Sequence, residues 1–397
     1  MAHAYTLSKM PNYAVYMMNT LVLITYHVKV KIGNRVHLRM KMNKRKLKKA
    51  VRRLKYLLIS PKLLPYTKNK ISHYSNQRKQ SLTVAHPSTI MIELTNRCNL
   101  HCTTCPREYQ YGKEMDMGHI DFTLFKSIVE QSAPYLDSIG LTGLGEPLLY
   151  KDLKKSLEFI KSKDKGLITS ISSNLMLPNT KEIISEIYPY LDTLQVSVDG
   201  LGEVYNTIRK KANFDIFDKN LRDVARLLRY TKTDILLNVV LVEENLSQVS
   251  DIIKYAANLN ISYVNFTILN LAGIPDIDTK YYELYYSENF KSKIREAKET
   301  ARQYPNVDVS FWDIETESGF KKCAAPWGHF YITFDGYSVP CCGKPFPKEK
   351  HFGNLKEKPL IDCLNSDDFM VFRKLWQQNI SPAFCKDCNY IYSFEKK

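Results

Sequence analysis

The N-terminal part of the sequence lacks acidic residues. No Asp or Glu precedes Glu93, whereas residues 1–85 carry 19 Lys and Arg. The remainder of the chain has 38 basic and 41 acidic residues and is therefore close to neutral. The net charge of +16 belongs to one segment, which favours contact with an anionic partner or surface.

The sequence also lacks the signals of a secreted or membrane-spanning protein. Its start does not combine a basic segment, an apolar core and a small-residue cleavage site, as a signal peptide does. Residues 10–28 carry no Lys, Arg, Asp or Glu, but Pro11, Asn12 and Asn19 interrupt the apolar run of about 20 residues that a spanning helix needs. We expect a cytoplasmic protein whose nine cysteines bind metal rather than form disulfides.

Within the basic segment, the pattern predicts a hairpin followed by an amphipathic helix. Apolar and basic residues alternate over residues 28–42 on both sides of Gly33 and Asn34, which are typical of a two-residue turn. Helical spacing follows, and Pro61 ends the helix. Its apolar stripe is Leu47, Ala50, Val51, Leu54 and Leu58, and its basic face is Lys46, Lys48, Lys49, Arg52, Arg53 and Lys55.

Two roles stay open for this helix. Its basic face could bind an anionic membrane surface, which would make the protein peripheral to the membrane. Its apolar stripe could instead pack on the rest of the protein, with the basic face solvated. The native start also stays open between Met1, Met40 and Met42.

From Ser88 onward, short β-rich runs alternate with helical stretches. Alternation of this kind predicts the α/β class, here a partial (β/α)6 barrel similar to a TIM barrel, with a small C-terminal cysteine-rich auxiliary-cluster domain. The predicted strands are residues 89–94, 138–143, 167–172, 193–198, 234–242 and 262–268. The predicted units are residues 1–85 (basic extension), 86–270 (core), 271–320 (helical connector) and 321–397 (C-terminal domain).

Three cysteines follow the first predicted strand at C-x3-C-x2-C spacing, namely Cys98, Cys102 and Cys105. In barrels of this kind, loops at the carboxyl ends of the strands carry the chemistry. Three thiolates can bind three irons of a [4Fe–4S] cluster and leave the fourth iron open to an exogenous ligand. A structural zinc site normally takes four protein ligands, so the spacing favours iron–sulfur over zinc.

The stretch IELTNRCNLHCTTCPR, residues 92–107, resembles the signature of the radical S-adenosylmethionine (SAM) superfamily, with Thr104 in place of the usual aromatic residue before the third cysteine. The resemblance implies that the three cysteines hold a [4Fe–4S] cluster and that SAM binds its open iron. It further implies reductive cleavage of SAM to a 5′-deoxyadenosyl radical, which abstracts a hydrogen atom from a substrate C–H bond. A reducing donor such as flavodoxin or ferredoxin would supply the electron.

Further elements resemble the family in the expected order over roughly residues 87–268. They are the GLGEP loop after the second strand, the end of the third strand, SVDG after the fourth strand, and the element YNTIR. The resemblance implies that a glutamate accepts from the SAM ammonium and that an arginine binds the SAM carboxylate. The implied SAM-binding residues are Gly145, Glu146, Ser173, Asn174, Ser197 and Arg209.

A second cysteine set lies near the C-terminus. The spacing C-x12-G-x4-C from Cys323 to Cys341, with a later C-x2-C at Cys385 and Cys388, resembles the SPASM domain and its shortened twitch form. The resemblance implies a second, auxiliary [4Fe–4S] cluster held by these four cysteines. Cys342 and Cys363 are left over and are interpreted as small buried residues. A zinc ribbon is the alternative for this region.

Three functions compete. We favour oxidation or epimerisation of a sugar-like or aminocyclitol-like small molecule, because the single auxiliary cluster resembles 2-deoxy-scyllo-inosamine dehydrogenase and related epimerases and dehydratases. The alternative is a radical peptide or protein maturase. From another class, an iron–sulfur or zinc protein could bind nucleic acid through the basic segment, but no nucleic-acid-binding module is recognisable. No catalytic acid or base emerges, and Cys363 is the one speculative hydrogen-atom donor.

Overall fold

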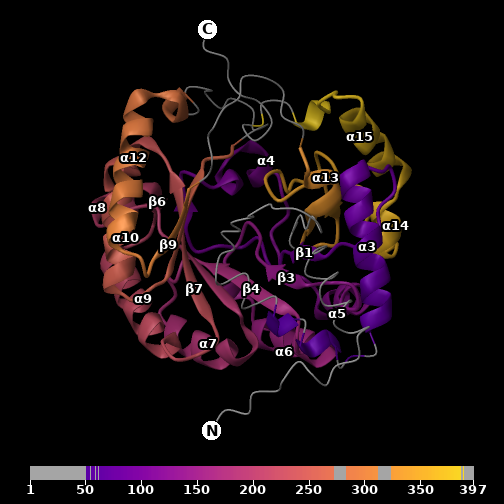
Figure 1. Ribbon diagram of the computed structural model, residues 1–397, viewed down its shortest axis with the longest axis horizontal. Coiled ribbons are helices and arrows are strands. Elements are labelled where there is room, and N and C mark those ends of the chain that lie inside the picture. Colours follow the sequence, from indigo (N-terminus) through magenta and orange to yellow (C-terminus); the bar gives the residue numbers. More distant parts are fainter. Residues whose placement is uncertain are drawn as a thin grey trace, which may run out of the picture.

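The computed structural model describes residues 51–53, 55–58, 60, 62–271, 283–311, 323–385 and 388 of the 397-residue chain (Figure 1). The predicted hairpin at residues 28–42 and the start of the predicted amphipathic helix lie outside this part. None of the helices in the described part has the length and hydropathy needed to cross a membrane.

A curved sheet in the strand order β11-β10-β1-β3-β4-β5-β7-β8-β9 forms the centre of the molecule (Figure 1). All six predicted strands occur in it, adjacent and parallel. The α/β prediction and the partial barrel are confirmed. The bounds are β1 Thr89–Ile92, β3 Ser138–Leu141, β4 Ile168–Ser173, β5 Thr193–Ser197, β7 Asp234–Leu241 and β8 Tyr263–Ile268.

Helices cover the outer face of this sheet and bury alternate strand side chains beneath them (Figure 1). The intervening side chains, such as Ser172, Asn238 and Thr267, stay half exposed and line the interior. Period-two burial of this kind gives the barrel an apolar outside under the helices and a polar inside. The main outer helices are α5 Phe122–Ser132, α6 Leu153–Lys163, α7 Thr180–Ile187, α9 Phe214–Leu228, α10 Val249–Asn258 and α12 Glu288–Gln303.

The C-terminal part continues the same sheet. Strand β10 (Phe330–Ile332) pairs in parallel with β1, and β11 (Ser338–Val339) pairs antiparallel with β10. At the other edge, β9 (Asp308–Phe311) extends the sheet beyond β8. These three strands were not predicted. The remaining helices of this part are α13 Ala325–Gly328, α14 Leu360–Leu364 and α15 Asp367–Gln377. The division into units at residues 85, 270 and 320 stays a prediction.

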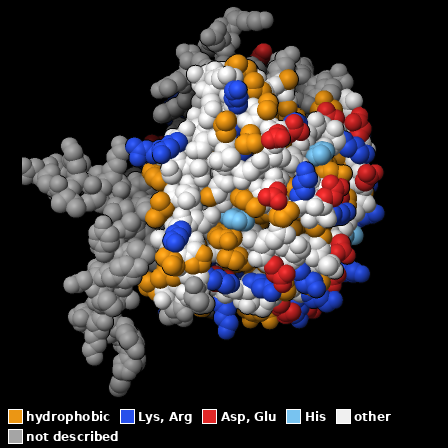
Figure 2. Space-filling model, turned by 90° about the vertical axis from the view of Figure 1, so that its right-hand side faces the viewer, with side chains coloured by type: hydrophobic (Ala, Val, Ile, Leu, Met, Phe, Trp, Pro, Cys, Tyr) orange, Lys and Arg blue, Asp and Glu red, His pale blue; other side chains and the backbone are white. Residues whose placement is uncertain are grey.

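Helix α3 (Leu63–Lys79) also escaped prediction, and it joins the N-terminal segment to the C-terminal part. Gln77 of α3 donates to the carbonyl of Trp327, and the Trp327 indole donates to the carbonyl of Ser81. Figure 2 views the face that carries α3, α14 and α15, where most charged side chains lie toward the right and bottom and hydrophobic side chains are scattered over the whole face. The exposed hydrophobic residues there include Leu64 and Val371.

Carboxylates at the amino ends of three adjacent strands bind the basic N-terminal segment. Asp137, Asp164 and Asp192 lie just before β3, β4 and β5, at the edge of the sheet opposite to the strands' carboxyl ends. Arg53 Nη1 lies 2.6 Å from Asp164 Oδ2, and Arg52 Nη2 lies 2.6 Å from Asp192 Oδ1.

This contact corrects the predicted orientation of the basic helix. Arg52 and Arg53 were assigned to its free basic face, yet both pair with the barrel, and Arg53 is only 4% exposed. Val51, which was assigned to the packed stripe, is 59% exposed. Buried carboxylates at the amino ends of the strands attract the guanidinium groups inward, because an unpaired buried charge is costly. The membrane role of the remaining basic residues stays a prediction.

We expect Asp192→Ala to destabilise the fold by about 3–5 kcal/mol, because it leaves a buried ammonium without its partner. The Asp192 carboxylate is 1% exposed and lies 2.7 Å from Lys161 Nζ, which is itself 10% exposed. Urea unfolding measures the loss. The matched control is Glu296→Ala, which breaks an exposed pair with Lys293 and should cost under about 1 kcal/mol. Equal losses of unfolding free energy in the two variants would contradict a stabilising role for the buried pair of Asp192 and Lys161.

The same variant has a pH signature. Burial alone would raise the pKa of Asp192, but Lys161 and Arg52 outweigh burial and the pKa is lowered. A carboxyl with a lowered folded-state pKa stabilises fully above its ordinary pKa of about 3.9 and loses that contribution as the pH falls through the lowered value. The stability gap between wild type and Asp192→Ala should therefore shrink in acid below pH ~4. A stability difference between wild type and Asp192→Ala that widens in acid would contradict a lowered pKa of Asp192.

Candidate cluster and cofactor site

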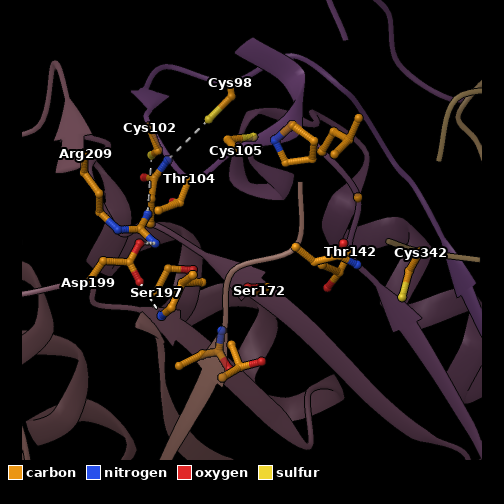
Figure 3. Close-up of a pocket in the computed structure, with 18 of the residues that line it drawn as sticks. Cys98, Cys102, Thr104, Cys105, Thr142, Ser172, Ser197, Asp199, Arg209 and Cys342 are labelled. Atoms are coloured by element: carbon orange, nitrogen blue, oxygen red, sulfur yellow. Dashed lines mark hydrogen bonds and ion pairs between the residues drawn. The ribbon is translucent and has the colours of Figure 1, made fainter. Parts of the chain in front are cut away.

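A cavity of about 370 Å³ opens at the carboxyl ends of the central strands (Figure 3). Cavities of this size suit a small-molecule ligand. Its wall contains every cysteine of the first set and every predicted SAM-binding residue: Cys98, Cys102, Cys105, Gly145, Glu146, Ser173, Asn174, Ser197 and Arg209. Residues that lie up to 111 positions apart in the sequence thus share one pocket, while their individual roles stay predictions.

The loop that carries the first three cysteines is held by backbone contacts. Strand β2 (His101–Cys102) pairs antiparallel with β6 (Arg209–Lys210), which places Cys102 directly opposite Arg209. Arg107, itself buried, donates to the carbonyls of Cys98 and Leu100. Together these contacts shape the loop around its thiols and bring the YNTIR element beside it.

The three thiols fit an iron–sulfur cluster by their chemistry. Burial raises the pKa of Cys102 to about 11 and that of Cys105 to about 12, so neither thiol ionises readily by itself. Iron binding would release these protons, since metal ligands must be deprotonated. Donors already face the sulfur atoms: Asn174 Nδ2 lies 3.6 Å from Cys98 Sγ, and Arg209 Nη1 lies 3.8 Å from Cys102 Sγ.

The GLGEP loop lies directly against the segment that precedes Cys98. A Cβ atom added to Gly143 would lie 2.3 Å from Glu93 Cγ, and one added to Gly145 would lie 2.4 Å from the carbonyl oxygen of Thr95. Both distances are impossible for a real Cβ atom, so glycine is required at both positions for this approach. The two loops at the ends of β1 and β3 are therefore fitted to each other.

Glu93 joins three parts of the site through one buried carboxylate. Its Oε1 accepts from the backbone N–H of Leu144 and from the Tyr331 hydroxyl, each at 2.9 Å, and its Oε2 accepts from Phe334 N at 3.2 Å. The side chain is completely buried. It thus connects the cluster loop, the GLGEP loop and the C-terminal part of the chain.

Glu146 occupies the floor of the pocket, with 2% of its surface exposed. Its two carboxylate oxygens accept from the backbone N–H groups of Leu148 (3.1 Å) and Asn174 (2.7 Å). Burial raises its pKa to about 7. The Ser173 side chain also hydrogen-bonds this carboxylate. A carboxylate has about four lone-pair sites, so an ammonium arriving in the pocket would still find an oriented acceptor.

Arg209 is anchored before any ligand arrives. Its Nη2 lies 2.8 Å from Asp199 Oδ2, and the other oxygen of Asp199 accepts from Val240 N at 2.8 Å. The buried Arg209 Nε has no hydrogen-bond partner. The guanidinium is therefore held in a fixed orientation at the pocket by Asp199. Asp199 is part of the SVDG motif and could have been identified there.

The auxiliary cysteines lie in the C-terminal part, behind the pocket wall. Cys323, Cys385 and Cys388 are half buried and pack against the core, and Cys341 follows β11. Burial raises the pKa of Cys323 to about 11, and the backbone N–H of Ala325 points at its sulfur from 3.3 Å. These thiols have the same half-buried character as those of the first set. Their assignment as ligands stays a prediction.

One of the two leftover cysteines differs from its predicted state. Cys363 is completely buried in α14, as expected of a small core residue, and does not line the pocket. Cys342 does line it and is exposed, so its interpretation as a buried spare residue is wrong. Figure 3 shows Cys342 beside Thr142, across the pocket from Cys102 and Arg209. Its position next to Cys341, a predicted cluster ligand, did not indicate in the sequence that Cys342 lines the pocket.

Comparison with known protein families supports both halves of this description. Residues 92–281 match the radical SAM superfamily, and residues 323–389 match the SPASM iron–sulfur cluster-binding domain. The second match favours iron–sulfur over the zinc-ribbon alternative for the C-terminal cysteines. The cofactors are therefore a [4Fe–4S] cluster with SAM and auxiliary iron–sulfur.

Relatives match across most of the chain. The tungsten-containing aldehyde ferredoxin oxidoreductase cofactor-modifying protein of Pyrococcus furiosus is 25% identical over 76% of this chain and 86% of its own length. The PqqA peptide cyclase of Bradyrhizobium diazoefficiens is 25% identical over 79% of this chain and 82% of its own. Among solved structures, Streptococcus suis SuiB bound to precursor peptide SuiA shares the fold, with a TM-score of 0.60, 17% identity, and coverage of 90% of this chain and 77% of that one.

Gly143→Ala should weaken SAM binding at least about tenfold, which corresponds to about 1.4 kcal/mol. The added methyl group would displace the GLGEP loop from Glu93 without touching a cysteine. Equilibrium dialysis of the reconstituted protein against SAM measures the effect. Gly140→Ala is the matched control, because its Cβ would make an ordinary 3.5 Å contact with Met91. Unchanged affinity in Gly143→Ala would mean that the loop does not contribute to the SAM site.

Replacing Cys98, Cys102 and Cys105 together by Ala should halve the iron content. Two Cys-ligated [4Fe–4S] clusters give about eight irons per chain, and loss of the first leaves about four. Iron analysis and 5′-deoxyadenosine release after anaerobic reduction are the measurements, and SAM cleavage should disappear. Retained cleavage in the triple variant would contradict the assignment, as would tightly bound zinc in place of the remaining iron.

Proposed function

The chain is a radical SAM enzyme with a C-terminal SPASM domain, and we propose that its substrate is a peptide or a protein. The observation that supports this most strongly is the match to PqqA peptide cyclase, which extends through both halves of the chain. This proposal replaces the sugar-like substrate favoured from the sequence. That preference depended on the small number of auxiliary cysteines, which does not distinguish the two substrate classes.

The reaction begins with SAM held in the pocket. When bound, the cluster supplies the electron that cleaves SAM and so provides the oxidising adenosyl group. Glu146 would accept from the ammonium of the methionine part, and the Arg209 guanidinium would donate to the carboxylate. Because Asp199 anchors the same guanidinium, the arginine donates in a fixed direction and little side-chain entropy is lost on binding.

Small polar side chains form the wall beneath. Ser172, Ser197 and Asn238 come from β4, β5 and β7 and face the pocket at the carboxyl ends of these strands. Asn238 Oδ1 accepts from Asn265 Nδ2 at 2.8 Å, which turns the Asn238 amide N–H groups toward the cavity. These donors suit hydroxyl and carbonyl groups, such as those of a ribose or of a peptide backbone.

The substrate side of the pocket is formed by the last strand of the core and by the C-terminal part. Asn270 follows β8 and approaches Gly343, so that a Cβ on Gly343 would lie 2.7 Å from Asn270 Nδ2. The C-terminal part thus borders the reaction space directly and excludes solvent from one side of it. A side chain of a peptide substrate could enter between these walls while its backbone stays outside.

The proposal predicts that a small peptide encoded beside the gene for this chain is modified in its presence. Co-expression of the chain with each flanking short reading frame, followed by mass spectrometry, should reveal a change in mass such as loss of two hydrogens, or a deuterium gained in D2O. The change arises because removal of a hydrogen atom leaves a carbon radical that must form a bond or regain hydrogen.

The control for this experiment is the Cys98, Cys102, Cys105→Ala variant, which should leave the peptide unmodified. Peptide modification by that variant would contradict radical SAM chemistry as the cause. Conversion of an aminocyclitol or sugar by the wild-type enzyme, with every flanking peptide unchanged, would overturn the peptide proposal and restore the small-molecule alternative.

A further inference from the structure

Cys342 places a thiol in the pocket from the side opposite to the cluster loop. All nine cysteines fall in the described part of the chain, and among them Cys342 is the exposed one. It lines the same cavity as Cys98, Cys102 and Cys105. In Figure 3 it lies next to Thr142, with the open pocket between it and the group formed by Cys102, Arg209 and Asp199.

The predicted cluster ligands leave this thiol unused. Four cysteines at C-x12-G-x4-C and C-x2-C positions satisfy one cubane, and Cys342 stands outside that pattern. Arg209 lines the same pocket, is 7% exposed, and has a buried Nε–H without a hydrogen-bond partner, so its guanidinium is not fully satisfied within the protein. A ligand seated against Arg209 would lie between the two groups of cysteines.

We propose that Cys342 is a hydrogen-atom donor to the substrate radical. A thiol S–H bond is weaker than most C–H bonds, so a carbon radical within reach takes its hydrogen. Because the adenosyl group abstracts from the cluster side and Cys342 faces the pocket from the other side, the carbon would receive its new hydrogen on the opposite face. The outcome is inversion at that carbon. This step requires radical SAM chemistry and does not depend on the substrate being a peptide.

The step balances as follows. The substrate C–H bond is broken by the adenosyl radical, which becomes 5′-deoxyadenosine and leaves a carbon radical. The Cys342 S–H bond breaks, a new C–H bond forms, and a thiyl radical remains on Cys342. One electron and one proton restore the thiol. An auxiliary iron–sulfur cluster held in part by Cys341, the adjacent residue, would be the source of the electron, and solvent in the open pocket would supply the proton. A reducing protein would then return the electron to that cluster.

Alkylation of the holoenzyme tests the state of the thiol without any substrate. Anaerobically reconstituted full-length protein is treated with iodoacetamide and digested for mass spectrometry. Cluster ligands are protected and Cys363 is buried, so Cys342 should be the labelled position among the described cysteines. SAM added first should slow the labelling several-fold. Protection of Cys342 in the holoenzyme, together with loss of iron in Cys342→Ala, would make it a cluster ligand and overturn the proposal.

Deuterium transfer tests its reactivity. The holoenzyme is given SAM and dithionite in D2O, with no added thiol, so that the adenosyl radical is quenched inside the pocket. The exchangeable S–D of Cys342 should place one deuterium in 5′-deoxyadenosine. Cys342→Ala and Cys342→Ser should lower the deuterated fraction several-fold at unchanged iron content, while Cys363→Ala should match the wild type. An unchanged fraction in both Cys342 variants would remove Cys342 as a donor.

Discussion

The buried carboxylate of Glu93 is the contact on which the arrangement of the whole site depends. A carboxylate that is buried away from water needs hydrogen-bond donors, because burying a polar group without a hydrogen-bond partner costs ~2–7 kcal/mol. The three donors come from Leu144, Tyr331 and Phe334, which belong to the GLGEP loop and to the C-terminal part. In the structure, the placement of these segments satisfies all three donors. Glu93 therefore holds the cluster loop, the GLGEP loop and the C-terminal part together.

This constraint explains why the loop sequences are so particular. Close approach to Glu93 and to the chain after it excludes a side chain at Gly143 and Gly145. With both positions free of Cβ atoms, Glu146 reaches the floor of the pocket and accepts from the backbone of Asn174. The Asn174 side chain then points at Cys98. A chain of contacts thus runs from one buried acid to the sulfur of the first cysteine, through residues that belong to three different strand ends.

The sequence predicted the parts of the fold that repeat a simple pattern and missed those that depend on distant partners. The six core strands alternate with amphipathic helices, and their carboxyl ends bring the motif residues together. Helix α3 was missed because the face that it buries carries Tyr66, Lys70 and His73, so apolar residues show no helical period. Strand β10 is three residues long and is defined by its pairing with β1, about 240 residues earlier in the chain. The position of Cys342 likewise depends on how the two halves of the chain meet.

The basic N-terminal segment shows that the partners of a charged segment can lie within the same chain. Taken alone, a run without acidic residues suggests an external anionic partner. In the folded chain, part of that charge has internal partners: Arg53 pairs with Asp164, and Lys70 pairs with Asp137. The acidic residues that neutralise this part belong to the amino ends of the core strands, so some of the charges that are unpaired along the sequence are paired in space. The same contacts hold α3 against the barrel at the end opposite to the pocket. Basic groups that are already paired with the barrel are not available to a membrane or a nucleic acid. If such a guanidinium or ammonium left the barrel, it would leave a buried carboxylate without its partner, which is costly.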